Sequence, residues 1–307
     1  MKKTALVYDD VFLTHEMPKS HHESRYRLIE IINVLKKSPV WEKLIHLKPD
    51  KASLADILRI HQFSYIEKVN TFGHGYLDPD TYLSENSVKA ALYAAGAIIT
   101  AIRMCKSGEI ERAFCAVRPP GHHAEADRAM GFCIYNNIAV GARFAQSLGY
   151  ENVFIIDFDV HHGNGTQHSF YCDDTVFYFS THQYPHYPGT GNAEERGIGK
   201  GIGYTCNIPL SRGSGDQKMH DAYHNKLHTL VEQFSPDIIL VSAGYDILHN
   251  DPLAGLNVTD DGVRDIVRGI LSSKYGIPVV FTLEGGFNVD ALSTSVLITV
   301  DELLTYG

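Results

Sequence analysis

The sequence predicts a single α/β domain with a central, mostly parallel β-sheet and helices on both faces. Short, nearly continuous apolar runs recur along the chain, which is typical of strands buried on both sides. Helical patterns separate several of these runs, and this alternation is typical of α/β folds. No repeat, low-complexity tract or linker divides the chain, so we treat residues 1–307 as one domain.

The apolar runs and the helical patterns can be placed on the sequence. The expected strands are Thr4–Tyr8, Arg112–Val117, Asn152–Val160, Thr175–Ser180, Asp237–Ser242 and Pro278–Leu283. The expected helices are Ser87–Lys106, Asn136–Leu148, Gln217–Phe234 and Asp260–Tyr275. Glycine follows three of these helices closely, at positions 108, 149 and 276, as is common where a helix ends.

Composition narrows the class of protein. Hydrophobic residues make up 44% and charged residues 21%, an ordinary globular balance. The net charge of −9 argues against broad nucleic-acid binding and favours cationic or neutral substrates. Five cysteines without C-x-x-C spacing suit a reducing cytoplasm. With no signal peptide and no stretch approaching a membrane span, we expect a soluble cytoplasmic protein without a membrane partner. The oligomeric state is left open.

Polar segments follow four of the expected strands directly. These segments contain RPPGHH, DFDVHHGNG, GYD and EGGFN. In open α/β sheets, ligands bind outside the carboxyl ends of the strands. We therefore expect the four polar segments to converge at one edge of the sheet.

A metal site is the first chemistry that these segments predict. Asp157, Asp159 and His161 are spaced by two, so an extended backbone directs them to one side. Asp246 ends another strand, and Asp159, His161 and Asp246 together would leave one position open for water. That arrangement is typical of a catalytic zinc, although Fe²⁺ or Co²⁺ could use the same ligands. The alternative is a set of polar strand caps, but buried strand ends rarely gather carboxylates without a cation.

A histidine pair is the second feature. The turn Arg118–Gly121 contains two prolines and leads into His122 and His123. A histidine with a near-neutral pKa is a suitable base for activating water. Asp157 could orient one imidazole and Asn164 the other. Alone, the pair could equally be two surface histidines on a turn.

In this order and combination, the motifs resemble the histone deacetylase superfamily over nearly the whole chain. They are RPPGHH (118–123), GFC (131–133), DFDVHHGNG (157–165), YPGTG (187–191), SAGYD (242–246), DPLAG (251–255) and LEGGFN (283–288). The Asn in HHGNG and the phrase SAGYD are most similar to class II and bacterial histone deacetylase-like amidohydrolases, which are related to acetylpolyamine amidohydrolases. The resemblance implies an arginase/deacetylase fold with about eight strands.

The resemblance also implies roles for individual residues. Asp159, His161 and Asp246 would bind Zn²⁺; His123 would be the general base, and His122 its partner, backed by Asp157. The implied substrate-binding set is Phe132 and Tyr187 as channel walls, with Gly131, Gly285 and Gly286. Structural K⁺ is implied at Asp157, Asp159, His161, Ser180 and Thr181, and at Phe170, Asp173, Val176 and Tyr204. Asp80, in an Asp- and Pro-rich turn, could hold a substrate amide or a cationic tail, or could simply shape the turn.

Phe287 departs from the family pattern, which has tyrosine at this position. The tyrosine hydroxyl would donate a hydrogen bond to the oxyanion of the transition state, and losing such a donor typically costs about 100- to 1000-fold in rate. Three explanations are open. Phe287 is an engineered replacement, a native residue whose role another group fills, or the sign of a protein that binds acylated ligands without hydrolysing them.

We therefore expect a zinc-dependent amidohydrolase that converts N-acetyl-lysine or a related acetylated amine into acetate and a free amine. One alternative is a weak or inactive acyl-lysine- or acylamine-binding protein. A less favoured alternative is an arginase-like ureohydrolase, whose corresponding strand reads Asp-x-His-x-Asp rather than Asp157-x-Asp159-x-His161.

Overall fold

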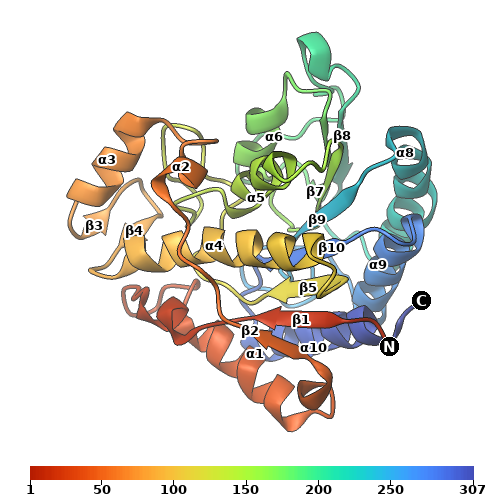
Figure 1. Cartoon of the computed structure of the whole chain (residues 1–307), viewed down its shortest axis with the longest axis horizontal. Helices are drawn as coiled ribbons and strands as arrows, with labels where there is room; N and C mark the ends of the chain where they lie inside the picture. The colour runs from red at the N-terminus through yellow and green to blue at the C-terminus, as the bar shows by residue number, and fades with distance from the viewer.

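In the computed structural model, which describes residues 1–307, the centre of the molecule is an eight-stranded sheet in which every pairing is parallel (Figure 1). Its strands, in spatial order, are β2 (Ile45–Leu47), β1 (Thr4–Val7), β5 (Arg112–Cys115), β10 (Val279–Leu283), β9 (Ile238–Ala243), β6 (Val153–Asp157), β7 (Val176–Gln183) and β8 (Thr205–Leu210). A separate antiparallel pair consists of β3 (Gly75–Tyr76) and β4 (Tyr82–Leu83). The predicted fold class is confirmed.

Helices cover both faces of the sheet, as Figure 1 shows. One layer contains α4 (Ser87–Lys106), α5 (Asn137–Ser147) and α6 (Asn164–Phe170). The other contains α1 (Arg25–Lys37), α10 (Val289–Thr305), α9 (Asp260–Ser273) and α8 (Leu227–Phe234). The remaining helical segments include α2 (Leu54–Ile57), α3 (Phe63–Thr71), α7 (Asp216–His220) and the 3₁₀ turns η1 (Asp10–Thr14), η2 (Trp41–Lys43) and η3 (Gly199–Gly201).

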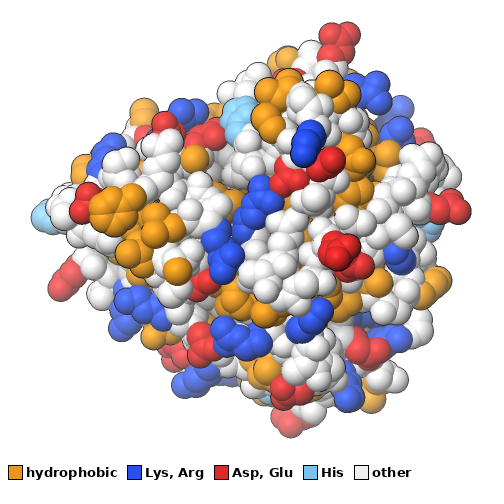
Figure 2. All heavy atoms as spheres, turned by 45° about the horizontal axis from the view of Figure 1, so that its top comes forward, with side chains coloured by type: hydrophobic (Ala, Val, Ile, Leu, Met, Phe, Trp, Pro, Cys, Tyr) orange, Lys and Arg blue, Asp and Glu red, His pale blue; other side chains and the backbone are white.

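The central strands are apolar because helices cover both of their faces. Every residue of β9, β10 and β6 is buried, and a core of 69 buried residues extends across the sheet. The Ala-rich α4 contributes Ala94, Ala97 and Ile98 to this core, and the segment before α2 crosses this helix so closely that a Cβ at Gly96 would overlap the backbone oxygen of Asp50. Lys/Arg and Asp/Glu side chains are intermixed over the face seen in Figure 2.

One expectation about α4 needs correction. We expected no segment to approach a membrane span, but Ser87–Lys106 is long and apolar enough to cross a membrane, with a mean hydropathy of 1.4. In the structure 67% of that window is buried against the rest of the protein. Its apolarity is therefore explained by its place in the core.

The structure adds elements that the sequence patterns do not predict. The edge strand β2 has only three residues and is largely exposed, so it carries no buried apolar run. In α10, Ser, Thr and β-branched residues weaken the local helix signal. The expected helix Gln217–Phe234 is three pieces, because a π-helical turn, η4 (Asp221–Lys226), separates α7 from α8.

Candidate active site

Four neighbouring strands place the polar segments at one edge of the sheet, as predicted. The strands β5, β10, β9 and β6 are adjacent and parallel, so the segments that follow them converge. A cavity of about 220 Å³ opens there. Its lining residues are Asp80, Pro120, His122, His123, Gly131, Phe132, Asp159, His161, His186, Tyr187, Asp246, Leu253, Gly285 and Phe287.

The residues proposed as metal ligands lie together at this cavity. His161 Nδ1 is 3.1 Å from Asp159 Oδ1 and 3.2 Å from Asp246 Oδ2. One potential ligand atom of each residue lies within 4.8 Å of the others. Asp246 Oδ2 is buried, and its close polar neighbour, His161 Nδ1, does not lie in hydrogen-bond geometry, so the oxygen has no hydrogen-bond partner. A buried carboxylate oxygen without a donor is costly, so this atom fits a site that holds a cation.

The charges of these residues support the same conclusion. Burial and the neighbouring Asp159 raise the pKa of Asp246 to about 7. Burial alone would lower the pKa of His161, but the carboxylates of Asp159 and Asp246 outweigh it and raise that pKa to about 10. The two carboxylates thus hold a proton on the imidazole between them. A divalent cation would supply the same positive charge, and two oxygens with one nitrogen suit zinc.

Glycines make room for the carboxylates. A Cβ at Gly285 would overlap Asp246 Oδ2, and a Cβ at Gly244 would overlap Asp159 Oδ2. The Gly285 N–H also donates to Asp159 Oδ2 at 2.8 Å. Gly286, which we expected to contact substrate, is not among the cavity-lining residues. Its carbonyl oxygen instead accepts a hydrogen bond of 2.7 Å from the buried Arg27 Nε.

The two histidines of RPPGHH have the partners that the sequence suggested. His122 Nδ1 lies 3.0 Å from Asp157 Oδ2, and His123 Nδ1 lies 2.8 Å from Asn164 Oδ1. Burial and the imidazole of His122 hold the pKa of His123 well below its usual value. Burial also opposes charge on His122, but Asp157 and Asp159 prevail and raise its pKa to about 10. The pair therefore combines a neutral imidazole with a protonated one.

Glu284 is a site residue that the sequence reasoning missed. Its Oε2 accepts hydrogen bonds from the Gly121 N–H (2.6 Å) and the His122 N–H (3.2 Å). Its Oε1 accepts from Ser242 Oγ at 2.9 Å. Burial raises the pKa of Glu284 to about 7. A carboxylate directly after a buried strand was the available signal, and here it joins the ends of β5, β9 and β10.

Aromatic rings form the walls of the cavity. Phe132 and Phe287 meet edge to face with ring centroids 5.9 Å apart, and Tyr187 lies 5.2 Å from His123. His186, which we did not predict, stacks on His161 at 5.1 Å. Pro120 and Leu253 were also missed as lining residues, although both lie in motifs quoted above.

The turn before α4 places Asp80 at the cavity. Asp80 Oδ1 accepts from the Gly131 N–H at 2.9 Å, so the carboxylate positions the segment that carries Phe132. Asp78 Oδ1 accepts from the backbone of Asp80 (3.1 Å) and Thr81 (2.6 Å), which is the pattern of a local turn.

Phe287 presents an apolar ring to the cavity. Its backbone N–H donates to Asp251 Oδ2 at 2.8 Å, and the guanidinium of Arg27 lies 5.1 Å from the ring centroid. Arg27 also donates to the Glu284 carbonyl, and it forms an ion pair with the buried Glu23, to which Arg118 is paired as well. Arg27, paired with Glu23, therefore fixes the backbone of the segment after β10, and the sequence reasoning identified neither residue as part of the site.

The residues implied for K⁺ fall into two places. Asp157 and Ser180 are register partners on β6 and β7, beside the group Asp159, His161 and Asp246, which we call the cation trio. The side chains of Ser180 and Thr181 are already bonded, to His182 Nδ1 and to Tyr223 Oη. In the second set, Asp173 Oδ2 forms an ion pair with Arg143 at 2.6 Å. The other residues of that set are Phe170, Val176 and Tyr204, which do not line the cavity.

Fold and site together define an α/β protein with a buried group of two carboxylates and an imidazole that could hold a cation, and comparisons with known proteins identify its family. The histone deacetylase domain matches residues 21–303, so the chain belongs to the histone deacetylase family.

Individual relatives agree with this assignment. A probable deacetylase of Archaeoglobus fulgidus is 38% identical over 294 residues, which cover 94% of this chain and 82% of that protein. The chloroplastic histone deacetylase 10 of Oryza sativa subsp. japonica is 40% identical over 305 residues, covering 92% and 69%. The crystal structure of the HDA15 HD domain superposes with a TM-score of 0.94 at 35% identity, covering 98% and 91%.

Proposed function

We propose that this protein is a metal-dependent deacetylase that hydrolyses N-acetyl-lysine or a related acetylated amine to acetate and the free amine. The proposal depends on one observation. The trio Asp159, His161 and Asp246 lines the same aromatic-walled cavity as two further imidazoles, the neutral His123 and the protonated His122. Zn²⁺ is the proposed cation; Fe²⁺ or Co²⁺ would accept the same ligands. When bound, the cation would polarise the acetyl carbonyl and lower the pKa of a nearby water molecule.

The two imidazoles divide the proton transfers. His123 is neutral and its Nδ1 is bonded to Asn164, so its other nitrogen is available to take the proton of the attacking water. His122 is held protonated by Asp157 and lies beside Asp159, with Nε2 3.8 Å from Oδ1. The C–N bond then breaks, and the amine leaves with a proton from His123 or from His122.

The cavity walls suit an unbranched amine stem. Phe132, Phe287 and Tyr187 offer apolar ring surface to methylene groups, while Asp80 adds a carboxylate at the same cavity. Acetyl-lysine in a protein and an acetylated polyamine both have such a stem. Relatives named as histone deacetylases favour an acetylated protein, and the net charge of −9 suits either cationic ligand.

Phe287 is the observation that favours the second candidate, a protein that binds acylated amines without rapid turnover. Its ring forms part of the cavity wall but offers no hydrogen-bond donor to an oxyanion. The named relatives are deacetylases, so the ureohydrolase alternative gains no support. We also propose that structural K⁺ binds near Asp157 and that the protein is cytoplasmic.

Replacing Phe287 with tyrosine tests the proposed function directly. We expect Phe287→Tyr to raise kcat for acetate release by about 100- to 1000-fold, because the new hydroxyl can donate to the oxyanion. The zinc-loaded proteins would be assayed on acetyl-lysine peptides and acetylpolyamines. Phe132→Tyr is the matched control, since it adds the same hydroxyl to the facing ring. No acetate from either the original chain or Phe287→Tyr, together with tight peptide binding, would favour the binding protein.

A further inference from the structure

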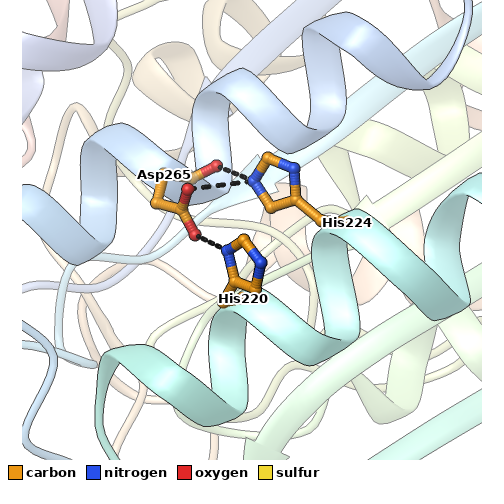
Figure 3. A group of neighbouring side chains, drawn as sticks. All are labelled: His220, His224 and Asp265. Carbon is orange, nitrogen blue, oxygen red and sulfur yellow. Dashed lines mark hydrogen bonds and ion pairs between the residues drawn. The ribbon is translucent and has the colours of Figure 1, made fainter.

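A second group of metal-ligating side chains lies outside the cavity. His220, at the end of α7, and His224, in the π-helical turn η4, both point toward Asp265 of α9 (Figure 3). His220 Nδ1 is 2.9 Å from Asp265 Oδ2, and His224 Nε2 is 3.0 Å from Asp265 Oδ1. The Asp265 carbonyl oxygen is also 3.0 Å from His224 Nε2. None of these residues lines the cavity.

The ligand atoms lie as close together as in the proposed catalytic trio Asp159, His161 and Asp246, although here one carboxylate lies between two imidazoles rather than one imidazole between two carboxylates. The chain has two groups of three such residues whose ligand atoms all lie within 4.8 Å of one another, and these are the two. In the catalytic trio the imidazole nitrogen is 3.1 and 3.2 Å from carboxylate oxygens, against 2.9 and 3.0 Å here. Two histidines one helical turn apart and a carboxylate are a donor set for zinc-like divalent ions.

Exposure indicates a different use from the catalytic site. The side chains of His220, His224 and Asp265 are 48%, 24% and 34% exposed, so water can complete the coordination of an ion. Three protein ligands from two packed segments are suited to join those segments. We propose that His220, His224 and Asp265 form a second, structural site for a divalent cation of the zinc class, which clamps the α7–η4 segment to α9.

The surroundings show what such a clamp would hold. Tyr223 lies between the two histidines in sequence, and its hydroxyl is 2.9 Å from Thr181 Oγ1 on β7. The backbone of α9 comes so close that a Cβ at Gly269 would lie 2.9 Å from Tyr223 Cβ. A cation at the histidines would therefore fasten a junction that connects α9, η4 and β7.

The next histidine along the seam provides a matched control. His228 Nε2 lies 3.0 Å from the Gly269 carbonyl oxygen, so it joins the same two segments. It is not part of the three-residue group. His228→Ala should therefore remove a helix contact without removing the cation site.

Zinc stoichiometry tests the proposal. Chelator-stripped protein would be dialysed against Zn²⁺ in the low micromolar range, desalted and analysed for metal by atomic emission. We expect two ions per chain in the unmodified protein and in His228→Ala, and one in His220→Ala/His224→Ala. The Asp265→Asn variant should also bind one zinc ion per chain. Its amide oxygen can still accept a hydrogen bond from an imidazole, but the negative charge that a cation needs is lost. Deacetylase activity is measured in parallel, so loss of the catalytic ion is recognised separately.

Thermal unfolding gives a second readout. Once one ion per chain is bound, further Zn²⁺ should raise the Tm of the unmodified protein and of His228→Ala by about 2 °C or more, because it binds only the folded state. The double variant should show no such rise. Equal zinc stoichiometry and an equal Zn²⁺-dependent rise in Tm in the unmodified protein and the double variant would overturn the proposal, as would a second ion that binds only at millimolar Zn²⁺.

Discussion

Gly285 lies where the two carboxylates of the cation trio approach the segment after β10. A Cβ there would overlap Asp246 Oδ2 and lie 2.6 Å from Asp159 Oδ2. We expect Gly285→Ala to lower Zn²⁺ affinity by at least about tenfold, because the carboxylates must move from the geometry that serves the cation. Competition with a chromogenic chelator measures the affinity.

The control for this residue is Gly215→Ala. Its Cβ would also meet a close neighbour, the Asn257 carbonyl oxygen at 2.9 Å, but that contact lies outside the cavity. If both substitutions left the affinity of the trio unchanged, the side-chain positions would not depend on Gly285. Its lack of a side chain would then need another explanation.

At the scale of elements, α1 supports the segment that carries Gly285 and Phe287. The buried Arg27 donates to the Gly286 and Glu284 carbonyls and pairs with Glu23. Arg27→Met removes these bonds and leaves buried acceptors unpaired, so we expect a loss of about 3–5 kcal/mol in the free energy of unfolding. Arg25→Met is the control on the same helix, because Arg25 is 47% exposed and pairs with Glu16 at the surface, where about 1 kcal/mol or less is at stake. Denaturant unfolding that gave the two variants the same stability would contradict this role of Arg27.

The elements also show what sequence could and could not predict. The central strands were predictable, because burial on two faces gives a local apolar run. The extended backbone expected through His161 was wrong: β6 ends at Asp157, and Asp159 and His161 lie in a bend after it, so a period of two does not explain why they meet. Gly286, whose carbonyl oxygen accepts a hydrogen bond from Arg27, lies 259 positions away in the sequence, and no local pattern identifies such a contact. His186 reaches the site through a loop with no strand or helix of its own, and the edge strand β2 is too exposed to show an apolar run.

At the scale of the whole molecule, the order of strands in the sheet means that the site forms only after the C-terminal strands have been added. β9 and β10, from the last third of the chain, lie between β5 and β6. The trio therefore combines Asp159 and His161 after β6 with Asp246 after β9, while β5 leads to the histidine pair and β10 to Gly285. The site exists only when the C-terminal strands occupy the middle of the sheet, so cation binding is linked to folding of the whole chain.

That linkage has a definite pH dependence. The pKa of His161 is raised to about 10 and that of Asp246 to about 7, so below these values protons occupy the atoms that a cation needs. Zn²⁺ must displace about one proton near pH 8 and more below pH 7. Its affinity should therefore fall about tenfold for each pH unit of acidification above pH 7, and more steeply below.

The stabilisation by Zn²⁺ should follow this affinity. At a fixed, buffered free Zn²⁺ concentration above its Kd, the gain in unfolding free energy should grow by about 1.4 kcal/mol per pH unit between pH 7 and pH 8.5. Denaturant unfolding with and without Zn²⁺ measures the gain, and calorimetry in buffers of different ionisation enthalpy counts the protons released. The His220→Ala/His224→Ala background removes the second proposed site, so the change reports the trio alone. A gain independent of pH, with no proton release, would mean that Asp246 and His161 are not the groups that hold the cation.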